Sequence, residues 1–375
     1  MLKVLHLISG GDTGGAKTHI YSLMKGFKGL VDAHTVVFVP GPFYDEAKAM
    51  GLKITLVRQK GRFDLKSMDV VARMAKEEGV DLIHCHGARA NFNALFLRNK
   101  LHLPMVSTLH SDYLLDFKGH FIKDKIFTPM NVYALKRFPY YIAITENFKE
   151  MLIRRGFPKE RIFVVYNGID YEKEERAVSK EEFLARYGLN FGPDDPIFVM
   201  AARLDLVKDH RTLLRALSSI KDRLGTARFL LAGTGRDEEY LKEFVAREGL
   251  ADHVFFLGQV QDPFSLFGAG DVNLLTSKSE SFPYALLEGA KAGLAFVASN
   301  VGGISEMAGQ GGGLLFEGGN AQDLARVLLE VLDDPQGFKK RGAYLHQYVR
   351  ENFSAGAMAH RHLEIYEEIL GGQQQ

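Results

Sequence analysis

Cysteine is nearly absent from this chain, whose only thiol belongs to Cys85. One cysteine cannot form a disulfide within the chain, and it cannot build a zinc site from cysteine ligands. Disulfides are typical of oxidising compartments. We therefore expect a protein of a reducing compartment.

The chain also lacks an excess of charge and a long apolar run. It has 47 Lys and Arg against 46 Asp and Glu, so no overall positive field points to nucleic acid. No stretch approaches the length needed to cross a bilayer. The first apolar run, Val4–Ser9, is too short for the core of a signal peptide. These absences predict a cytoplasmic protein and leave open a peripheral contact with the inner face of the membrane.

What the chain does contain is a regular alternation of short apolar runs and helix-length segments. Its 375 residues are too many for one ordinary core, so two domains are expected. Several runs are continuously apolar, as in parallel strands covered on both faces. The strand candidates are Val4–Ser9, His34–Pro40, Lys53–Val57, Asp81–His86, Met105–His110, Tyr140–Thr145, Ile162–Gly168, Pro196–Leu204, Arg228–Gly233, Val254–Gly258, Val272–Ser277, Leu294–Ser299 and Gly312–Glu317. The alternation predicts a doubly wound α/β fold.

A charged segment with little strand character interrupts this alternation and sets the domain boundaries. We predict a Rossmann-like domain at 1–170, a helix and linker at 171–195, a second Rossmann-like domain at 196–352, a last helix at 353–370 and a disordered tail at 371–375. Open parallel sheets bind ligands beyond the carboxyl ends of their strands. Two such domains facing each other predict a central cleft.

A glycine-rich loop follows the first strand. Gly10, Gly11, Gly14 and Gly15 lead into a helix, where backbone N–H groups can approach an anion. The stretch Gly11–Thr18 nearly matches a P-loop, but Ala16 stands where that pattern requires glycine. A P-loop-like ATPase therefore stays open as an alternative, and so does a plain tight turn.

Two cations flank a strand-to-helix turn in the second half. Arg203 ends the strand candidate at Pro196–Leu204, and Lys208 lies five residues later. An arginine fork and a lysine point charge can converge on one diphosphate. Two solvated surface cations are the other interpretation.

Two carboxylates bracket the next strand-to-helix turn. Glu280 lies on the loop, Pro283 fits the first turn of a helix, and Glu288 falls in the second turn. A loop carboxylate can accept hydrogen bonds from sugar hydroxyls, and a helix carboxylate can accept both hydroxyls of a ribose. We expect the backbone N–H groups of Ser281, Phe282, Pro283 and Tyr284 and the helix dipole to favour phosphate between them. An ordinary surface residue is the alternative for Glu288.

In this order and spacing, the motifs resemble those of the retaining glycosyltransferases of the GT-B fold, specifically family 4 (glycosyltransferase group 1). The resemblance covers nearly the whole chain. Its motifs are GGA at Gly14–Ala16, T-L-H-S at Thr108–Ser111, NGID at Asn167–Asp170, RLDLVK at Arg203–Lys208, the pair Glu280 and Glu288, and VGGISE at Val301–Glu306. It implies a hexosyltransferase that moves a sugar from a UDP- or GDP-sugar to an acceptor hydroxyl in polysaccharide, glycolipid or related glycan synthesis.

The resemblance also implies residue roles. Arg203 and Lys208 would bind the donor diphosphate, Glu280 the donor sugar and Glu288 the ribose. His110 would reach the transferred sugar, so His110 and Glu280 are the catalytic candidates. Gly14 and Gly15 would lie by the phosphates or the acceptor. Lesser candidates are Gly258, Gln259 and Val260 for the base, and His86 and Lys17 for the acceptor side. The last helix would cross back to the acceptor-side first domain.

Three features depart from the family's usual pattern. Ser281 and Asp209 each stand where the family frequently has glycine. The run Gly293-Leu-Ala-Phe-Val lacks the proline of the common G-x-P-V-V run. None of these changes removes a charged ligand, so the expected activity is unaffected.

No metal or other cofactor is expected. The chain contains no D-x-D triplet, and the family picture has the leaving phosphate accept the proton of the acceptor. His84 and His86 share one strand face, but two histidines without a third ligand are more often structural.

One basic segment interrupts the first half. Lys118–Arg137 holds five Lys and Arg and one Asp, a net charge of +4, among apolar residues. Contact with a membrane surface or a lipid diphosphate is one interpretation, and a solvated helical face is the other.

The expected partners are a nucleotide-sugar donor and a glycan or lipid-linked acceptor, without nucleic acid. A sugar-nucleotide epimerase of the same architecture and a non-catalytic nucleotide-sugar sensor remain as alternatives, beside the ATPase.

Overall fold

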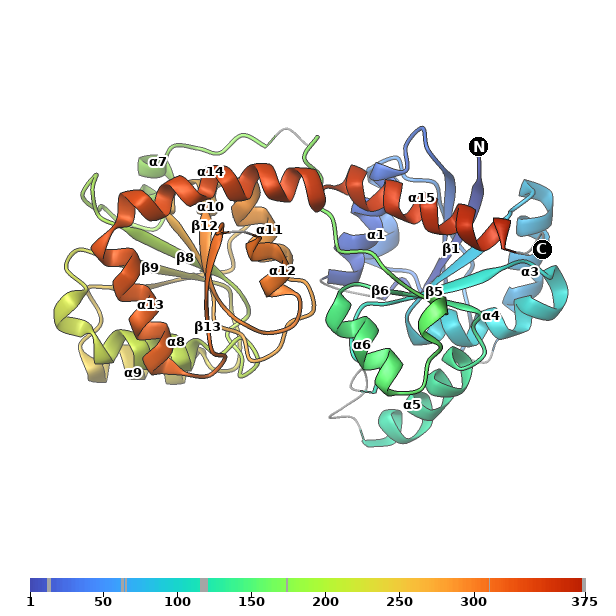
Figure 1. Cartoon of the computed structure of the whole chain (residues 1–375), viewed down its shortest axis with the longest axis horizontal. Coiled ribbons are helices and arrows are strands. Elements are labelled where there is room, and N and C mark those ends of the chain that lie inside the picture. Colours follow the sequence, from blue (N-terminus) through green and yellow to red (C-terminus); the bar gives the residue numbers. More distant parts are fainter. Residues whose placement is uncertain are drawn as a thin grey trace. The chain divides into compact units, whose positions relative to one another are not determined.

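The computed structural model describes residues 1–11, 15–61, 64, 66–114, 121–172, 175–309 and 311–372, with residues 121–124 described by their backbone alone. Within these ranges the chain divides into two compact units, Met1–Asp170 with Ser354–Gln375, and Tyr171–Phe353. Each unit is built on its own parallel sheet flanked by helices (Figure 1). The predicted doubly wound α/β class is confirmed.

The first unit has a sheet of seven strands in the order β3-β2-β1-β4-β5-β6-β7. The order reverses between β1 and β4, so this pair forms the topological switch point where open α/β sheets bind ligands. The elements are β1 (Lys3–Ile8), α1 (Gly15–Gly26), β2 (Asp32–Val37), α2 (Pro42–Ala49), β3 (Ile54–Leu56), α3 (Lys66–Glu78), β4 (Leu82–His86), α4 (Gly87–Leu101), β5 (Met105–Leu109), α5 (Phe121–Leu135), β6 (Tyr140–Ala143), α6 (Glu146–Arg154), a 3-10 turn (Lys159–Arg161) and β7 (Ile162–Val164).

The second unit has six strands in the order β10-β9-β8-β11-β12-β13, with its switch point between β8 and β11. The elements are α7 (Lys180–Ala185), β8 (Ile197–Ala201), α8 (His210–Ser219), a 3-10 turn (Lys221–Arg223), β9 (Arg228–Ala232), α9 (Glu238–Glu248), β10 (Val254–Gly258), α10 (Pro263–Gly268), β11 (Val272–Leu275), α11 (Tyr284–Lys291), β12 (Ala295–Ser299), α12 (Ile304–Ala308), β13 (Gly313–Phe316), α13 (Ala321–Asp333) and α14 (Pro335–Asn352).

The last helix, α15 (Ala355–Gly371), belongs to the first unit and packs on α1 (Figure 1). The NGID motif explains this attachment. Ile169 pairs with Ser354, and a Cβ on Gly168 would clash with the Ser354 carbonyl, so only glycine permits the approach. Asp170 binds Lys25 of α1 at 2.9 Å. Of the predicted disordered tail, Gly371 is the last residue of α15, and residues 373–375 lie outside the described part.

Alternation along the strands of the first unit divides its core between the two faces of the sheet. Leu5 and Leu7 of β1 pack in the cluster with α3 and α4, whereas Val4 and Ile8 pack in the cluster with α1 and α15. Since side chains alternate with a period of two, His6 points to the same face as Val4 and Ile8. His84 and His86 share that face with Leu82, as the sequence predicts.

No described helix combines the length and apolar character that a membrane span requires.

Candidate functional site

The switch point of the second unit gathers most of the predicted donor residues. β8 and β11 are neighbours in the sheet, and both are parallel strands whose carboxyl ends meet at one edge. Arg203 and Lys208 follow β8, and Glu280 follows β11. The loop positions predicted from spacing are therefore brought together by topology.

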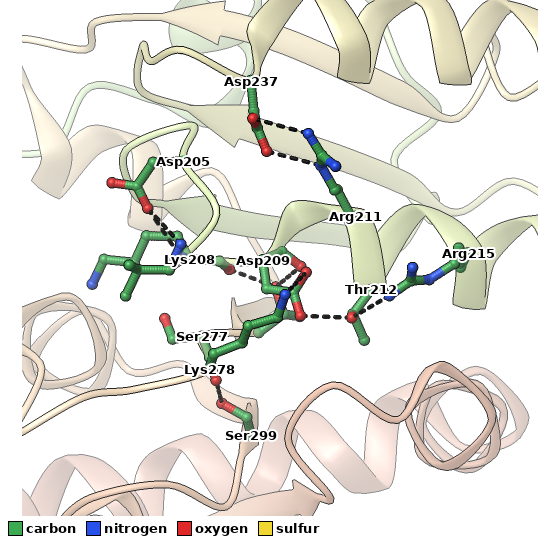
Figure 2. A network of polar contacts seen from close by, with 12 residues as sticks. Asp205, Lys208, Asp209, Arg211, Thr212, Arg215, Asp237, Ser277, Lys278 and Ser299 are labelled. Carbon is green, nitrogen blue, oxygen red and sulfur yellow. Dashed lines mark hydrogen bonds and ion pairs between the residues drawn. The ribbon is translucent and has the colours of Figure 1, made fainter.

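The loop that carries Lys208 is held by the side chain of Asp205 (Figure 2) and by Thr276, the residue after β11. Asp205 accepts the backbone N–H groups of Val207 and Lys208 through Oδ1, each at 3.0 Å. From the other side, the Thr276 hydroxyl lies 3.1 Å from the carbonyl oxygen of Lys208 and 3.1 Å from that of Asp209, to which it can donate. The loop is thus fixed in position before a ligand binds.

Asp209 has a backbone conformation that favours glycine. Its φ of 49° lies in the left-handed region, which glycine enters without a Cβ penalty. Asp is tolerated there because its side chain bonds locally. Its Oδ2 accepts the Thr212 hydroxyl at 2.7 Å, and Lys278 lies 3.6 Å from Oδ1 (Figure 2).

Lys208, Glu280 and Ser277 form the centre of this site. The Lys208 ammonium lies 2.5 Å from Glu280 Oε1, and the Ser277 hydroxyl donates to the same oxygen at 2.6 Å. The side chains of Lys208 and Glu280 are 20% and 10% exposed. Both of these contacts fall on Oε1 of Glu280. A fixed carboxylate with one engaged oxygen and one available oxygen suits a ligand hydroxyl.

The VGGISE motif contacts the backbone of the loop that carries this carboxylate. Gly302 has a φ of 59°, and a Cβ on it would clash with the carbonyl oxygen of Glu280. The N–H of Gly303 donates to the Ser281 carbonyl at 2.8 Å. The double glycine therefore lets the loop after β12 lie directly on the Glu280 loop.

Arg203 is the more exposed of the two cations of the site. Its side chain is 76% exposed, and its guanidinium lies 3.3 Å from Asp205 Oδ2. Such an exposed pair holds the side chain weakly. Arg203 can therefore turn toward an anion at small cost.

The start of α11 differs from the prediction. The helix begins at Tyr284, so Pro283 is its N-cap residue and precedes the first turn. Proline has no N–H, so it cannot contribute one of the predicted phosphate donors. Phe282 is buried with its ring 5.0 Å from that of Phe353, so its side chain belongs to the core. Glu288 lies in the second turn as predicted, and it adds to burial in raising the pKa of Tyr284.

The predicted base region begins at Gly258, the last residue of the edge strand β10. Gly258 has a φ of 66°, and its carbonyl accepts the N–H of Gly233 at 2.7 Å. Val260 packs partly against the hydrophobic core, which leaves mainly backbone for a ligand.

Two glycines of the same edge were missed by sequence reasoning. A Cβ on Gly233 would clash with the Ala202 carbonyl, and one on Gly235 with the Leu204 carbonyl. They let the loop after β9 lie against the loop that carries Arg203. The sequence signal that could have identified them is the G-T-G triplet at Gly233–Gly235, which follows a strand.

The first unit has a pocket of about 310 Å³ at its own switch point. Ser9 follows β1, His86 ends β4 and His110 follows β5, and all three line it. Gly15 begins α1 beside Ala16 of the pocket wall, whereas Gly14 lies outside the described residues. His86 and His110 are thus brought together as predicted candidates.

Histidines fill the space behind this pocket. His86 Nδ1 lies 3.1 Å from His110 Nε2, and its Nε2 lies 3.0 Å from His6 Nδ1. Burial is the main cause that lowers the pKa of each of these three rings well below its usual value. The rings are therefore neutral near pH 7.

Three further histidines lie around His6, His86 and His110. His84 bonds Tyr366 and Thr108, each at 2.6 Å. His19 Nδ1 donates to Asn167 Oδ1 at 3.0 Å, and His362 Nδ1 to the Met358 carbonyl at 2.8 Å. Burial lowers the pKa of His19 to about 4 and that of His362 to about 3.

The premise that His84 and His86 lack a third histidine is wrong. His6, His84 and His86 form one group in which one ring nitrogen from each residue lies within 4.8 Å of the others, and His19, His86 and His110 form a second such group. Sequence reasoning missed His6, His19 and His362, because only the register of β1 on β4 and the packing of α1 and α15 bring them here.

Lys17 does not behave as a P-loop lysine. Its ammonium binds both carboxylate oxygens of Glu46 in α2, at 2.8 and 3.1 Å. An ammonium held by a carboxylate is a poor partner for a phosphate unless that pair breaks.

The basic segment Lys118–Arg137 contains the whole of α5 (Phe121–Leu135). Lys118, Gly119 and His120 lie outside the described residues. In the described part, Ile126 and Tyr133 are 48% and 54% exposed, and Arg137 stacks on the Tyr133 ring at 3.4 Å.

Together, the fold and the geometry define a two-domain Rossmann-like protein with a candidate site at the switch point of its second unit. The description "Glycosyltransferase Family 4" matches residues 13–173, and "Glycosyl transferases group 1" matches residues 183–351.

Relatives of known name agree with this class. An uncharacterized glycosyltransferase of Methanocaldococcus jannaschii is 27% identical over 95% of each chain. N-acetyl-alpha-D-glucosaminyl L-malate synthase of Bacillus anthracis is 24% identical over 82% of this chain and 80% of its own. The solved structure of Anabaena HepE in complex with UDP has a TM-score of 0.82 at 22% identity, over 98% of this chain and 100% of that one. The chain therefore belongs to the group 1, family 4 glycosyltransferases and has their GT-B fold.

Proposed function

We propose that this enzyme transfers a hexose or similar sugar from a UDP- or GDP-sugar to an acceptor hydroxyl and retains the anomeric configuration. The observation that carries the proposal is the Lys208–Glu280–Ser277 group at the switch point of the second unit. It pairs a cation for a phosphate with a fixed carboxylate for sugar hydroxyls, in a chain of this family.

Each residue has a separate role in the proposed reaction. Arg203 and Lys208 neutralise the charge that develops on the leaving diphosphate, which is electrostatic preorganisation. Glu280 accepts hydrogen bonds from the sugar, Glu288 from the ribose, and His110 acts on the transferred sugar. The leaving phosphate takes the proton of the acceptor, so the proposed reaction needs no metal.

The named complexes and relatives support a choice of donor. HepE is described in complex with UDP and with UDP-glucose. A relative from Escherichia coli, 24% identical, is named UDP-Gal:alpha-D-GlcNAc-diphosphoundecaprenol alpha-1,3-galactosyltransferase, and one from Corynebacterium glutamicum is named as GDP-mannose-dependent. We propose UDP-sugars first and GDP-mannose second, with glycan or lipid-linked acceptors in cell-surface glycan synthesis.

A donor panel tests the proposal in two stages. Thermal unfolding with UDP-, GDP- and ADP-sugars identifies the donor, because a ligand that binds the native state raises the apparent stability. The donor is then supplied with acceptor candidates, and the anomeric configuration of the product is read by NMR. Isomerised donor without an acceptor would favour an epimerase, binding without transfer a sensor, and magnesium-dependent ATP hydrolysis lost in Lys17→Ala the ATPase.

We further propose that the enzyme works in the cytoplasm and touches anionic lipid through α5. The exposed Ile126 and Tyr133 beside basic residues support this. Ile126→Glu should reduce sedimentation with vesicles of phosphatidylglycerol, whereas Tyr344→Ala, at an exposed tyrosine of α14, should not. Equal sedimentation of both variants would exclude α5 as the contact.

A further inference from the structure

A chain of three imidazoles leads from the interior of the first unit to its pocket. His110, which lines the pocket, is bonded through Nε2 to His86 at 3.1 Å, and His86 is bonded through its other nitrogen to His6 at 3.0 Å. The far nitrogen of His6, Nε2, is buried and has no hydrogen-bond partner among the described residues.

Neutral rings restrict how this chain can be protonated. A neutral imidazole donates through one nitrogen and accepts through the other. His86 uses both nitrogens, so its two hydrogen bonds must run in the same direction along the chain. Either every ring donates toward the pocket, or every ring donates toward the interior.

The buried end decides between these two directions. If the rings donate toward the interior, His6 Nε2 carries a hydrogen that has no acceptor. If they donate toward the pocket, His6 Nε2 is a bare nitrogen. Buried N–H groups without an acceptor are the rarer outcome in folded proteins. The second direction is therefore favoured, and it makes His110 Nε2 an acceptor and leaves the ring hydrogen on Nδ1.

We propose that His6 and His86 are positioning residues that hold His110 as a neutral ring with its hydrogen on Nδ1. His110 then offers a ligand oxygen a hydrogen-bond donor and no basic nitrogen. This inference rests on the proposed function for its meaning, since a His110 without a free lone pair cannot deprotonate the acceptor. The proton must leave by another group, as transfer to the leaving phosphate requires.

A metal ion is the competing occupant of the histidine groups. Both groups of three contain His86, whose two nitrogens are already used in hydrogen bonds. His84 likewise uses both nitrogens, on Tyr366 and Thr108. A metal would have to break these bonds, so the hydrogen-bonded chain accounts for the geometry better.

The direct test is the tautomer of His110 in the full chain. Ring-15N histidine labelling separates protonated from bare nitrogens by their shifts at pH 7, and the spectrum of His110→Gln assigns the His110 signals. A protonated Nδ1 and a bare Nε2 are expected. The opposite assignment would overturn the proposed direction.

Paired variants test the coupling from His6 to His110. Asn places an amide where His6 Nδ1 lies and can still donate to His86, whereas Leu has a similar shape and no donor. In His6→Leu we expect His110 to become a mixture of tautomers and kcat to fall about tenfold, near the worth of one hydrogen bond, with little change in the KM for donor. His6→Asn should restore the single His110 tautomer and the wild-type kcat.

His362→Leu is the matched control, because His362 is also buried but bonds only its own helix. It should leave the His110 signals unchanged. An unchanged His110 spectrum in a folded His6→Leu variant would refute the coupling. If that variant does not fold, the wild-type and His6→Asn spectra still decide which tautomer His110 adopts.

The spectra are independent of activity, so failure of the proposed function would appear separately, as a correct tautomer without sugar transfer. Stoichiometric metal in the purified enzyme would refute the hydrogen-bonded chain of His6, His86 and His110.

Discussion

At the scale of single residues, the site depends on one charged contact. Glu280→Gln keeps the shape but removes the charge that binds Lys208, and the amide places a donor where sugar hydroxyls need an acceptor. We expect kcat/KM to fall about 100-fold, which corresponds to roughly 3 kcal/mol, the upper range for a charged hydrogen bond. Steady-state kinetics with the donor identified by the panel measure this.

The control for that variant is Ser277→Ala. It removes one neutral donor to Glu280 and leaves the ion pair in place, so its loss should be about tenfold or less. Equal losses in the two variants would contradict the central role of the charge.

A second residue-scale prediction concerns the end of α4. His102 is the C-cap residue and has a φ of 50°, in the left-handed region that costs a residue with a Cβ about 1–2 kcal/mol. Its side chain is exposed and forms no hydrogen bond or ion pair with the described residues, so His102→Gly should stabilise the unit by about 1 kcal/mol. His102→Ala keeps the Cβ and should give no gain. Urea unfolding of the three proteins measures the difference, and equal stabilities would contradict the argument.

At the scale of elements, the loop after β12 should be as sensitive to substitution as the Glu280 loop that it contacts. In Gly302→Ala, the added Cβ meets the carbonyl of Glu280 itself, so the carboxylate must shift. Displacements near 1 Å at a reacting group can cost about 100-fold in rate. We expect a loss of that order in kcat/KM.

Gly319→Ala separates this effect from backbone strain. Gly319 also has a positive φ, 81°, but an added Cβ would meet nothing within 4 Å. It should lower stability by about 1 kcal/mol without a comparable loss of activity. Similar activities of the two alanine variants would show that contact with Glu280 is unimportant.

The elements also show what sequence reasoning can reach. Parallel strands read well from apolar runs, because each strand is covered on both faces. The candidates Arg203, Lys208 and Glu280 were recognisable because strand ends of one parallel sheet share an edge. The left-handed φ of Asp209 and the N-cap position of Pro283 were not, since backbone conformation within a short turn depends on contacts that spacing does not encode.

At the scale of the whole molecule, the histidine cluster was beyond sequence reasoning. Its members come from β1, α1, β4, the end of β5 and α15, and only sheet register and the return of the last helix bring them together. The H-x-H pattern of β4 predicted a shared face, yet nothing local identified His6, His19 or His362 as neighbours. Long-range packing therefore supplied the part of the site that motifs could not.

This burial of histidines makes the folded chain sensitive to acid. Burial is the main cause that lowers the pKa of His6, His19, His84, His86, His110 and His362 below the usual value of about 6.5. Below pH 6.5 these rings bind protons in the unfolded chain but remain neutral in the folded chain. The free energy of unfolding therefore decreases as the pH is lowered, by up to about 1.4 kcal/mol per pH unit for each ring.

The window between pH 6.5 and 5 isolates the histidines, because the carboxylates with lowered pKa, such as Asp112 and Glu78, lose their contribution only below about pH 4.5. Urea unfolding at steps of half a pH unit should give a steep slope in this window, and His362→Leu should reduce the slope by one proton. A flat wild-type curve over this window would mean that these rings accept protons in the folded state, and the neutral chain from His6 to His110 would then lose its basis.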